Sequence, residues 1–157
     1  MSQARIQAFY DAFRRLDAET MRAAYAEHAV FSDPAFDLQG RDRIGSMWNL
    51  LTDAVRAKGQ DVWRLDLSQV TDRSAHWEPH YRFSATGRIV HNVIDAEFVF
   101  DAQGLIAEHR DRFDFWRWSR QALGPVGTLL GWTPMLRNKV RQQAGANLDA
   151  WIAKKRR

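Results

Sequence analysis

Residues 89–116 read IVHNVIDAEFVFDAQGLIAEHRDRFDFW, and apolar and polar side chains alternate along most of this stretch. A period of two is typical of a β-strand that buries one face. The turn residues 102–104 divide the stretch, so the sequence predicts a hairpin of two strands over 89–100 and 105–116.

Three polar side chains interrupt the apolar faces of this hairpin. Asn92 lies among the apolar even positions of the first strand, and His109 and Asp111 lie among the apolar odd positions of the second. A buried carboxylate is costly unless it is paired, and burial raises carboxyl pKa values into the range of general acids and bases. We therefore predict Asp111 and His109 as catalytic residues and Asn92 as a ligand contact.

The segments before the hairpin predict helices first and strands later. Helical periodicity covers residues 6–16, a short segment after Asp17, and residues 44–55 after Gly40; a brief strand occupies residues 30–34. Two further strands are expected over 62–70 and 75–85. Helices followed by a meander predict an α+β fold, with three helices on one face of a curved antiparallel sheet.

The C-terminal third is expected to extend this single domain, which covers residues 1–157. Residues 123–132 (LGPVGTLLGW) are rich in glycine and too short to span a membrane, so we expect an apolar loop that covers a pocket or a partner surface. Thr133-Pro134 predicts the start of a C-terminal helix. The extension over 118–157 is thus an apolar loop followed by a basic helix.

Composition excludes several classes of protein. The chain has 157 residues, 45% of them hydrophobic, with nine Phe, seven Trp and three Tyr, which suffices for one core and a lined apolar pocket. The lack of cysteine excludes disulfide scaffolds, thiolate metal sites and cysteine nucleophiles. Without an apolar leader or a run of about 18 apolar residues, a cytoplasmic location is expected.

Positive charge is concentrated at the C-terminal end. Residues 110–157 hold 11 Lys and Arg against 3 Asp and Glu, a net charge of +8 within a chain of net charge +4. Such a segment could contact an anionic membrane surface, nucleic acid or an acidic partner, although a solvated helix face is the simpler interpretation. Nucleic-acid binding is not expected because basic residues and exposed aromatics do not interleave.

The order of elements, the segment AVFSDP at 29–34 and the closing hairpin together resemble the nuclear transport factor 2-like superfamily over residues 5–117. The resemblance implies a cone-shaped domain around an apolar pocket, and a homodimer formed through the outer sheet face. Asp33 stands where ketosteroid isomerases place their general base, which implies a catalytic role. Phe9 and Ala96 stand where those enzymes need a tyrosine and a protonated acid, so steroid isomerase activity is not expected.

The final strand, HRDRFD at 109–114, resembles two sister families. Limonene epoxide hydrolases carry a similar Arg-Asp-x-Phe-Asp segment, which implies that Asp111 acts on an attacking water, but Pro79 and Tyr81 replace their Arg-x-Asp pair. SnoaL-like polyketide cyclases are similar at His109-x-Asp111, which implies acid–base ring closure by Asp111 without a cofactor.

Two functions remain open from the sequence. The first is a cofactor-independent cyclase, isomerase or hydrolase of a small apolar molecule, with Asp111, His109 and Asp33 as catalytic residues. The second is a non-catalytic ligand-binding or assembly domain, in which Asp33 forms a turn and Asp111 a structural ion pair. The predicted ligand contacts, which could equally be core residues, are Asn92, Tyr81, Trp77, Trp48, Phe13 and Phe113.

A metal site is not expected. His109 and Asp111 would need a further histidine, and the strand histidines His76, His80 and His91 fall on the opposite parity.

Overall fold

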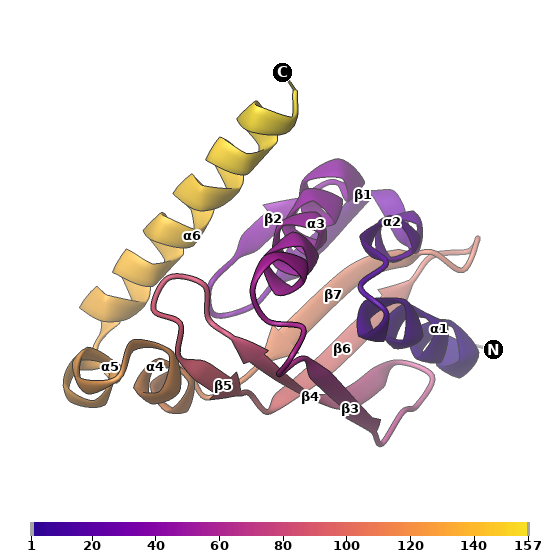
Figure 1. Ribbon diagram of the computed structural model, residues 1–157. Coiled ribbons are helices and arrows are strands. Elements are labelled where there is room, and N and C mark those ends of the chain that lie inside the picture. Colours follow the sequence, from indigo (N-terminus) through magenta and orange to yellow (C-terminus); the bar gives the residue numbers. More distant parts are fainter. Residues whose placement is uncertain (1, 157) are drawn as a thin grey trace.

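The computed structural model describes residues 2–156 and shows an α+β fold with one curved, unclosed sheet (Figure 1). The elements in chain order are α1 (Ser2–Arg14), α2 (Ala18–Ala23), β1 (Tyr25–Ser32), β2 (Asp37–Gln39), α3 (Arg41–Ala57), β3 (Arg64–Ser68), β4 (Ser74–Arg82), β5 (Ile89–His91), β6 (Ile94–Phe100), β7 (Ile106–Arg112), α4 (Phe115–Leu123), α5 (Pro125–Leu130) and α6 (Pro134–Lys155).

The sheet has the strand order β2-β1-β7-β6-β4-β3, and β5 pairs with β4. All pairs are antiparallel except β1 with β7, which is parallel, so the predicted antiparallel arrangement holds for every pair but this one. The predicted hairpin forms between β6 and β7, where Ala96 lies opposite Asp111 and Phe98 lies opposite His109. This register brings His109 and Asp111 of β7 to the inner face.

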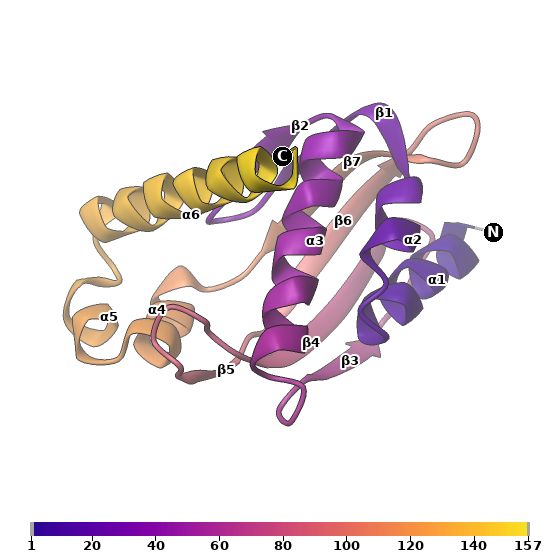
Figure 2. The ribbon, with the colours of Figure 1, turned by 45° about the horizontal axis from the view of Figure 1, so that its top comes forward.

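The three N-terminal helices lie across the concave face of the sheet, as expected (Figure 2). The Asp17 side chain caps α2 by accepting a hydrogen bond from the Thr20 amide at 3.1 Å, which satisfies a donor that the helix leaves free. Gly40, with φ of 98°, precedes α3 in a conformation that other residues rarely adopt. The apolar sides of the helices and the inner sheet face form the main core.

Several sequence expectations differ from the structure. The strand expected over 30–34 is β1, which covers Tyr25–Ser32, and β2 was not expected. The strand expected over 89–100 is broken into β5 and β6 at Asn92–Val93. The strand expected over 105–116 ends at Arg112, because Asp114 caps a helix by accepting from the Arg117 amide, so Phe115 opens α4. Residues 125–130 of the expected apolar loop are helical and form α5.

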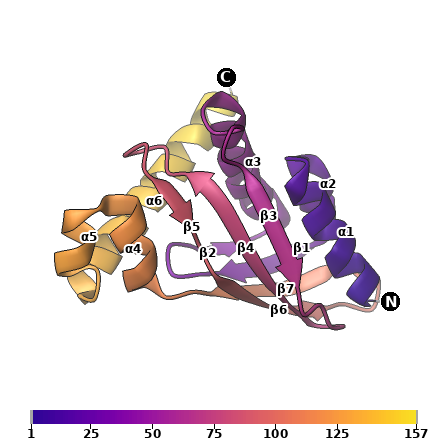
Figure 3. The ribbon, with the colours of Figure 1, turned by 60° about the horizontal axis from the view of Figure 1, so that its bottom comes forward.

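Apolar residues form two clusters. The main cluster fills the space between α1, α2, α3 and the sheet; the smaller one contains Val90, Phe115, Trp118 and Ala122, and Phe113 packs against both. Figure 3 shows α4 and α5 beyond the β5 side of the sheet, away from α1.

The C-terminal helix α6 docks on its own domain. Arg43 of α3 pairs with Asp149 at 2.9 Å, and Ile152 packs against the main cluster. None of the described helices is long and apolar enough to cross a membrane.

Candidate active site

A chain of buried hydrogen bonds ends on Asp111. The indole Nε1 of Trp48 donates to the Tyr25 hydroxyl at 3.1 Å, that hydroxyl lies 2.7 Å from Nδ1 of His109, and Nε2 of His109 lies 2.9 Å from Oδ1 of Asp111. The helix α3 and the strands β1 and β7 supply these residues. All four are at most 4% exposed, so their polar atoms depend on one another for partners.

The donors and acceptors along this chain of hydrogen bonds determine which ring nitrogen of His109 carries a proton. An indole nitrogen only donates, so the Tyr25 oxygen accepts from Trp48 and gives its single proton to Nδ1 of His109. Nε2 of His109 then carries the ring proton and donates it to Asp111. A doubly protonated ring would leave the phenol proton without an acceptor in a buried site, so the geometry favours the neutral imidazole and presents Oδ1 of Asp111 as an acceptor.

Packing holds the His109 ring in place. The rings of Phe98, Phe31 and Phe9 lie 4.3, 4.9 and 5.8 Å from it, centroid to centroid. The imidazole has little freedom to turn away from Asp111.

Asp33 follows β1 and forms the tight turn that its Asp-Pro sequence predicts. Its Oδ1 accepts the amides of Ala35 at 2.7 Å and Phe36 at 2.6 Å. Burial, and then the negative charge of Asp111, raise the pKa of Asp33 to about 7, against the opposing effect of the two amides and Arg141. Asp33 therefore combines a turn role with a carboxyl group that holds its proton close to neutral pH.

The C-terminal helix is tied to this turn. Arg141 of α6 donates from one guanidinium nitrogen to the carbonyl oxygens of Asp33 and Pro34, both at 3.2 Å. The position of Asp33 thus depends on a helix more than a hundred residues later in the chain.

Two neutral phenols lie beside the carboxyl groups. Trp118 Nε1 donates to the Tyr81 hydroxyl at 2.8 Å, and burial together with the charge of Asp33 raises the pKa of Tyr81 to about 12. Burial and then the charge of Asp111 raise the pKa of Tyr10 well above its usual value, and the Tyr10 hydroxyl is buried without a hydrogen-bond partner. The Tyr10 hydroxyl is thus a buried donor without a partner that feels the charge of Asp111.

Sequence reasoning missed three residues of this site: Tyr10, Tyr25 and Trp118. Tyr10 stands one position from the tyrosine expected by resemblance, yet it is fully buried and close to Asp111. Tyr25 opens β1, before the strand expected from residue 30, and a tyrosine at the start of an inner strand is a weak signal. Asp95, in contrast, lies on the outer face as its parity predicts, bonded to His76.

The structure divides the predicted ligand contacts between two regions. Phe13, Trp48 and Trp77 are at most 4% exposed in the main cluster, with Phe13 5.0 Å from Trp48 and 5.6 Å from Trp77 between ring centroids. Tyr81 packs against the smaller cluster, and Phe113 packs against both. The Asp111 charge raises the pKa of Asp33, and the Asp33 charge raises the pKa of Tyr81, so Asp33 is coupled electrostatically to a residue of each region.

Asn92 has a backbone role at the strand break. Its side-chain Oδ1 accepts a hydrogen bond from the backbone N–H of Val93 at 3.1 Å, and its backbone N–H donates to the Pro79 carbonyl. A contact between Asn92 and a ligand remains a prediction.

Two surface cavities lie elsewhere. One of about 710 Å³ is bordered by residues of α3, the strands β1 and β2, and the end of α6; one of about 510 Å³ borders Trp63 and β3. Neither is lined by Asp33, His109 or Asp111. Within residues 2–156, no group of three or more His, Asp or Glu side chains is arranged to hold a metal ion.

The sequence over residues 6–109 matches the family model of the SnoaL-like domain. The chain belongs to the SnoaL-like family. No curated protein matches it.

Solved structures with the same fold span most of this SnoaL-like chain. An LEH-like epoxide hydrolase from M. tuberculosis is 16% identical, with a TM-score of 0.60 over 82% of this chain and 94% of its own. A protein proposed to be a polyketide cyclase, from Xanthomonas campestris pv. campestris, is 20% identical, with a TM-score of 0.57 over 76% and 95%. A steroid delta-isomerase from Pseudomonas aeruginosa is 13% identical, with a TM-score of 0.56 over 97% and 94%. At these identities the likeness shows the nuclear transport factor 2-like fold.

Proposed function

We propose that this SnoaL-like chain is a cofactor-independent acid–base catalyst that acts on a small apolar compound with a carbonyl or epoxide oxygen. The observation that carries the proposal is the buried hydrogen-bond chain that ends on Asp111, whose charge adds to burial in raising the pKa of Asp33 to about 7. Acid–base sites typically contain a pair of titratable groups whose pKa values are shifted apart by their surroundings. Cyclases, isomerases and epoxide hydrolases among the proteins of this fold support the reaction class.

Asp111 acts as the base in this proposal. The N–H of His109 occupies Oδ1, which orients the carboxylate and leaves Oδ2 to accept a proton from an acidic carbon or from water. His109 is a positioning residue here, because its tautomer is fixed by Tyr25 rather than by the substrate.

Asp33 acts as the acid. Below pH of about 7 it carries a proton that it can give to the carbonyl or epoxide oxygen as negative charge develops there. The substrate then loses one proton to Asp111 and gains one from Asp33; return of a proton from Asp111 to Asp33 restores the starting state. The Tyr10 hydroxyl, a buried donor without a partner, can stabilise the same oxygen.

The test uses a panel of apolar compounds: steroid enones, terpene epoxides, polyketide β-ketones and fatty acids. Thermal shift reports binding, and product analysis reports turnover, for the native chain, Asp111→Asn and Asp33→Asn. His76→Gln, on the outer face, is the control.

We expect one compound class to bind and to be converted, with turnover reduced about a thousandfold in Asp111→Asn and affinity retained, which is the scale of a lost acid–base group. Binding without turnover, unaffected by Asp111→Asn, would instead support the non-catalytic ligand-binding domain.

A further inference from the structure

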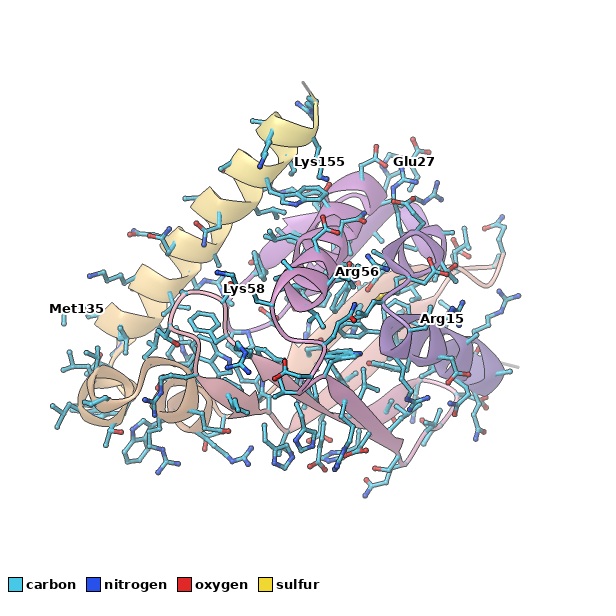
Figure 4. All side chains as sticks on the ribbon, viewed as in Figure 1. Arg15, Glu27, Arg56, Lys58, Met135 and Lys155 are labelled. Atoms are coloured by element: carbon cyan, nitrogen blue, oxygen red, sulfur yellow. The ribbon has the colours of Figure 1, made fainter. Side chains whose placement is uncertain are left out.

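Large apolar side chains are exposed on α4, α5 and the start of α6. These elements meet at one end of the molecule (Figure 1). Six of the ten large apolar residues exposed among residues 2–156 lie here, and they are between 39% and 70% exposed: Trp116, Val126, Leu129, Leu130, Trp132 and Met135. Figure 4 shows Met135 at the outer edge of this end. We refer to these six residues as the α5 corner.

The helix α5 packs on α4 through small residues, whereas a helix that contributes to a core normally packs through its large apolar residues. Gly127 and Gly131 are buried against Ser119, and a Cβ on either glycine would overlap it. The smallest residues of this segment therefore face the protein, while Leu129, at 70% exposure, and Val126 face water. An amphipathic helix that serves only its own fold shows the opposite arrangement, so the apolar face of α5 has another contact to make.

The charged residues within α4, α5 and the first half of α6 are all basic. Residues 115–148 contain five basic residues and no Asp or Glu. Arg120 lies over the Trp116 ring at 4.8 Å, and Arg137 lies over the Phe115 ring at 5.3 Å; with Lys139 they are exposed. Such side chains keep their apolar stems along the aromatic surface while the charged ends stay in water.

We propose that the α5 corner docks on an anionic lipid surface. Exposed Trp and Leu side chains with basic residues beside them match the chemistry of a bilayer interface with anionic headgroups. The corner projects from one end of the molecule (Figure 3), as contact with a broad surface requires. The proposal does not depend on the catalytic role of Asp111.

The test is cosedimentation of the full chain with vesicles of phosphatidylcholine alone, and with vesicles that also contain about 30 mol% phosphatidylglycerol. We expect binding only to the anionic vesicles, and weaker binding at high salt. The double variant Leu129→Ser/Trp132→Ser should reduce binding at least about tenfold because it removes the apolar contacts. Arg137→Glu/Lys139→Glu should also reduce it.

The matched control is Val99→Ser, an exposed apolar residue of β6 at 52% exposure, which should bind as the native chain does. Thermal unfolding of every variant shows whether it is folded. Absence of binding to anionic vesicles would overturn the proposal, as would equal losses in Val99→Ser and Leu129→Ser/Trp132→Ser. A dimer that Leu129→Ser/Trp132→Ser dissociates would overturn it in favour of contact between two copies.

Discussion

The two faces of the same sheet carry the same chemical pair in opposite surroundings. On the inner face, His109 lies 2.9 Å from Asp111, with side chains 0% and 3% exposed. On the outer face, His76 lies 2.8 Å from both Glu78 and Asp95, with side chains 20%, 32% and 74% exposed. The distance between the histidine and its carboxylate therefore does not distinguish the candidate site from a surface ion pair. The difference is burial: strand parity places one pair on the dry inner face and the other on the outer face, where water reaches it.

The energetic consequence of this difference is large. Exposed ion pairs contribute about 1 kcal/mol or less because water screens the charges and competes for the hydrogen bonds. In a buried pair, water cannot replace a lost partner. Removing one residue therefore leaves the other without a hydrogen-bond partner, at a cost of about 3–5 kcal/mol if a charge remains. Substitutions on the two faces should thus have effects of different size.

The largest effect is expected at Asp111. Asp111→Ala removes the acceptor of the His109 N–H in a buried site and should lower the free energy of unfolding by about 2–4 kcal/mol, measured by urea denaturation. Asp111→Asn keeps an acceptor oxygen, and should be more stable than Asp111→Ala while still lacking turnover. Equal stability of Asp111→Ala and the native chain would mean that the inner pair behaves as the outer one does.

Asp33→Asn should increase stability at alkaline pH. The folded-state pKa of Asp33, about 7, lies above the ordinary value of 3.8, so the native chain is stabilised by this group below about pH 4 and loses that stability as the pH rises to about 7. The shift corresponds to at most about 4 kcal/mol. An asparagine keeps an acceptor for the Ala35 and Phe36 amides and carries no charge.

The measurement is the free energy of unfolding of both chains at pH 4 and pH 8. The advantage of Asp33→Asn over the native chain should be greater at pH 8. An equal difference at both values would contradict the raised pKa.

Tyr25→Phe should have an intermediate effect. It removes the oxygen that accepts from Trp48 and donates to His109, at a cost of about 1–3 kcal/mol in denaturant unfolding. A cycle with Trp48→Phe tests the connection: the two substitutions should be non-additive, since they break the same hydrogen bond. Simple additivity would mean that the chain of hydrogen bonds does not act as a unit.

The smallest effect is expected at His76 on the outer face. Hydrogen bonds to Asp95 and then Glu78 raise the pKa of His76 above 6.5. The pair therefore stabilises the fold fully below about pH 6.5 and loses its contribution as the pH rises through the folded-state pKa. His76→Gln should cost less than about 1 kcal/mol at pH 6, and less in high salt, in urea denaturation. A cost as large as that of Asp111→Ala would remove the contrast between the faces.

Periodicity predicted the fold well because the sheet alternation and the helical stripes are local. The parity of residues 105–112 placed His109 and Asp111 on the inner face, and the parity of β4 and β5 placed His76, His80 and His91 on the other. The sequence predicted helix caps less well. Asp114 fits the alternation of a strand, and only the hydrogen bond from the Arg117 amide to its side chain identifies it as a helix cap.

The candidate site was only partly predictable, because its contacts join distant segments. Tyr25 and His109 are 84 positions apart, and Arg141 reaches Asp33 across 108 positions. No local pattern encodes such pairs. The role of Trp48 as a hydrogen-bond donor was likewise hidden within an apolar helix stripe.

The most direct test of the acid–base pair is a carbon-13 NMR titration of the Asp33 carboxyl in the native chain and in Asp111→Asn. The native chain should titrate near pH 7, and removal of the Asp111 charge should lower that value, since this charge is the second cause of the shift. An Asp33 carboxyl that titrates near its ordinary value of 3.8 in both proteins would contradict the proposed acid–base pair.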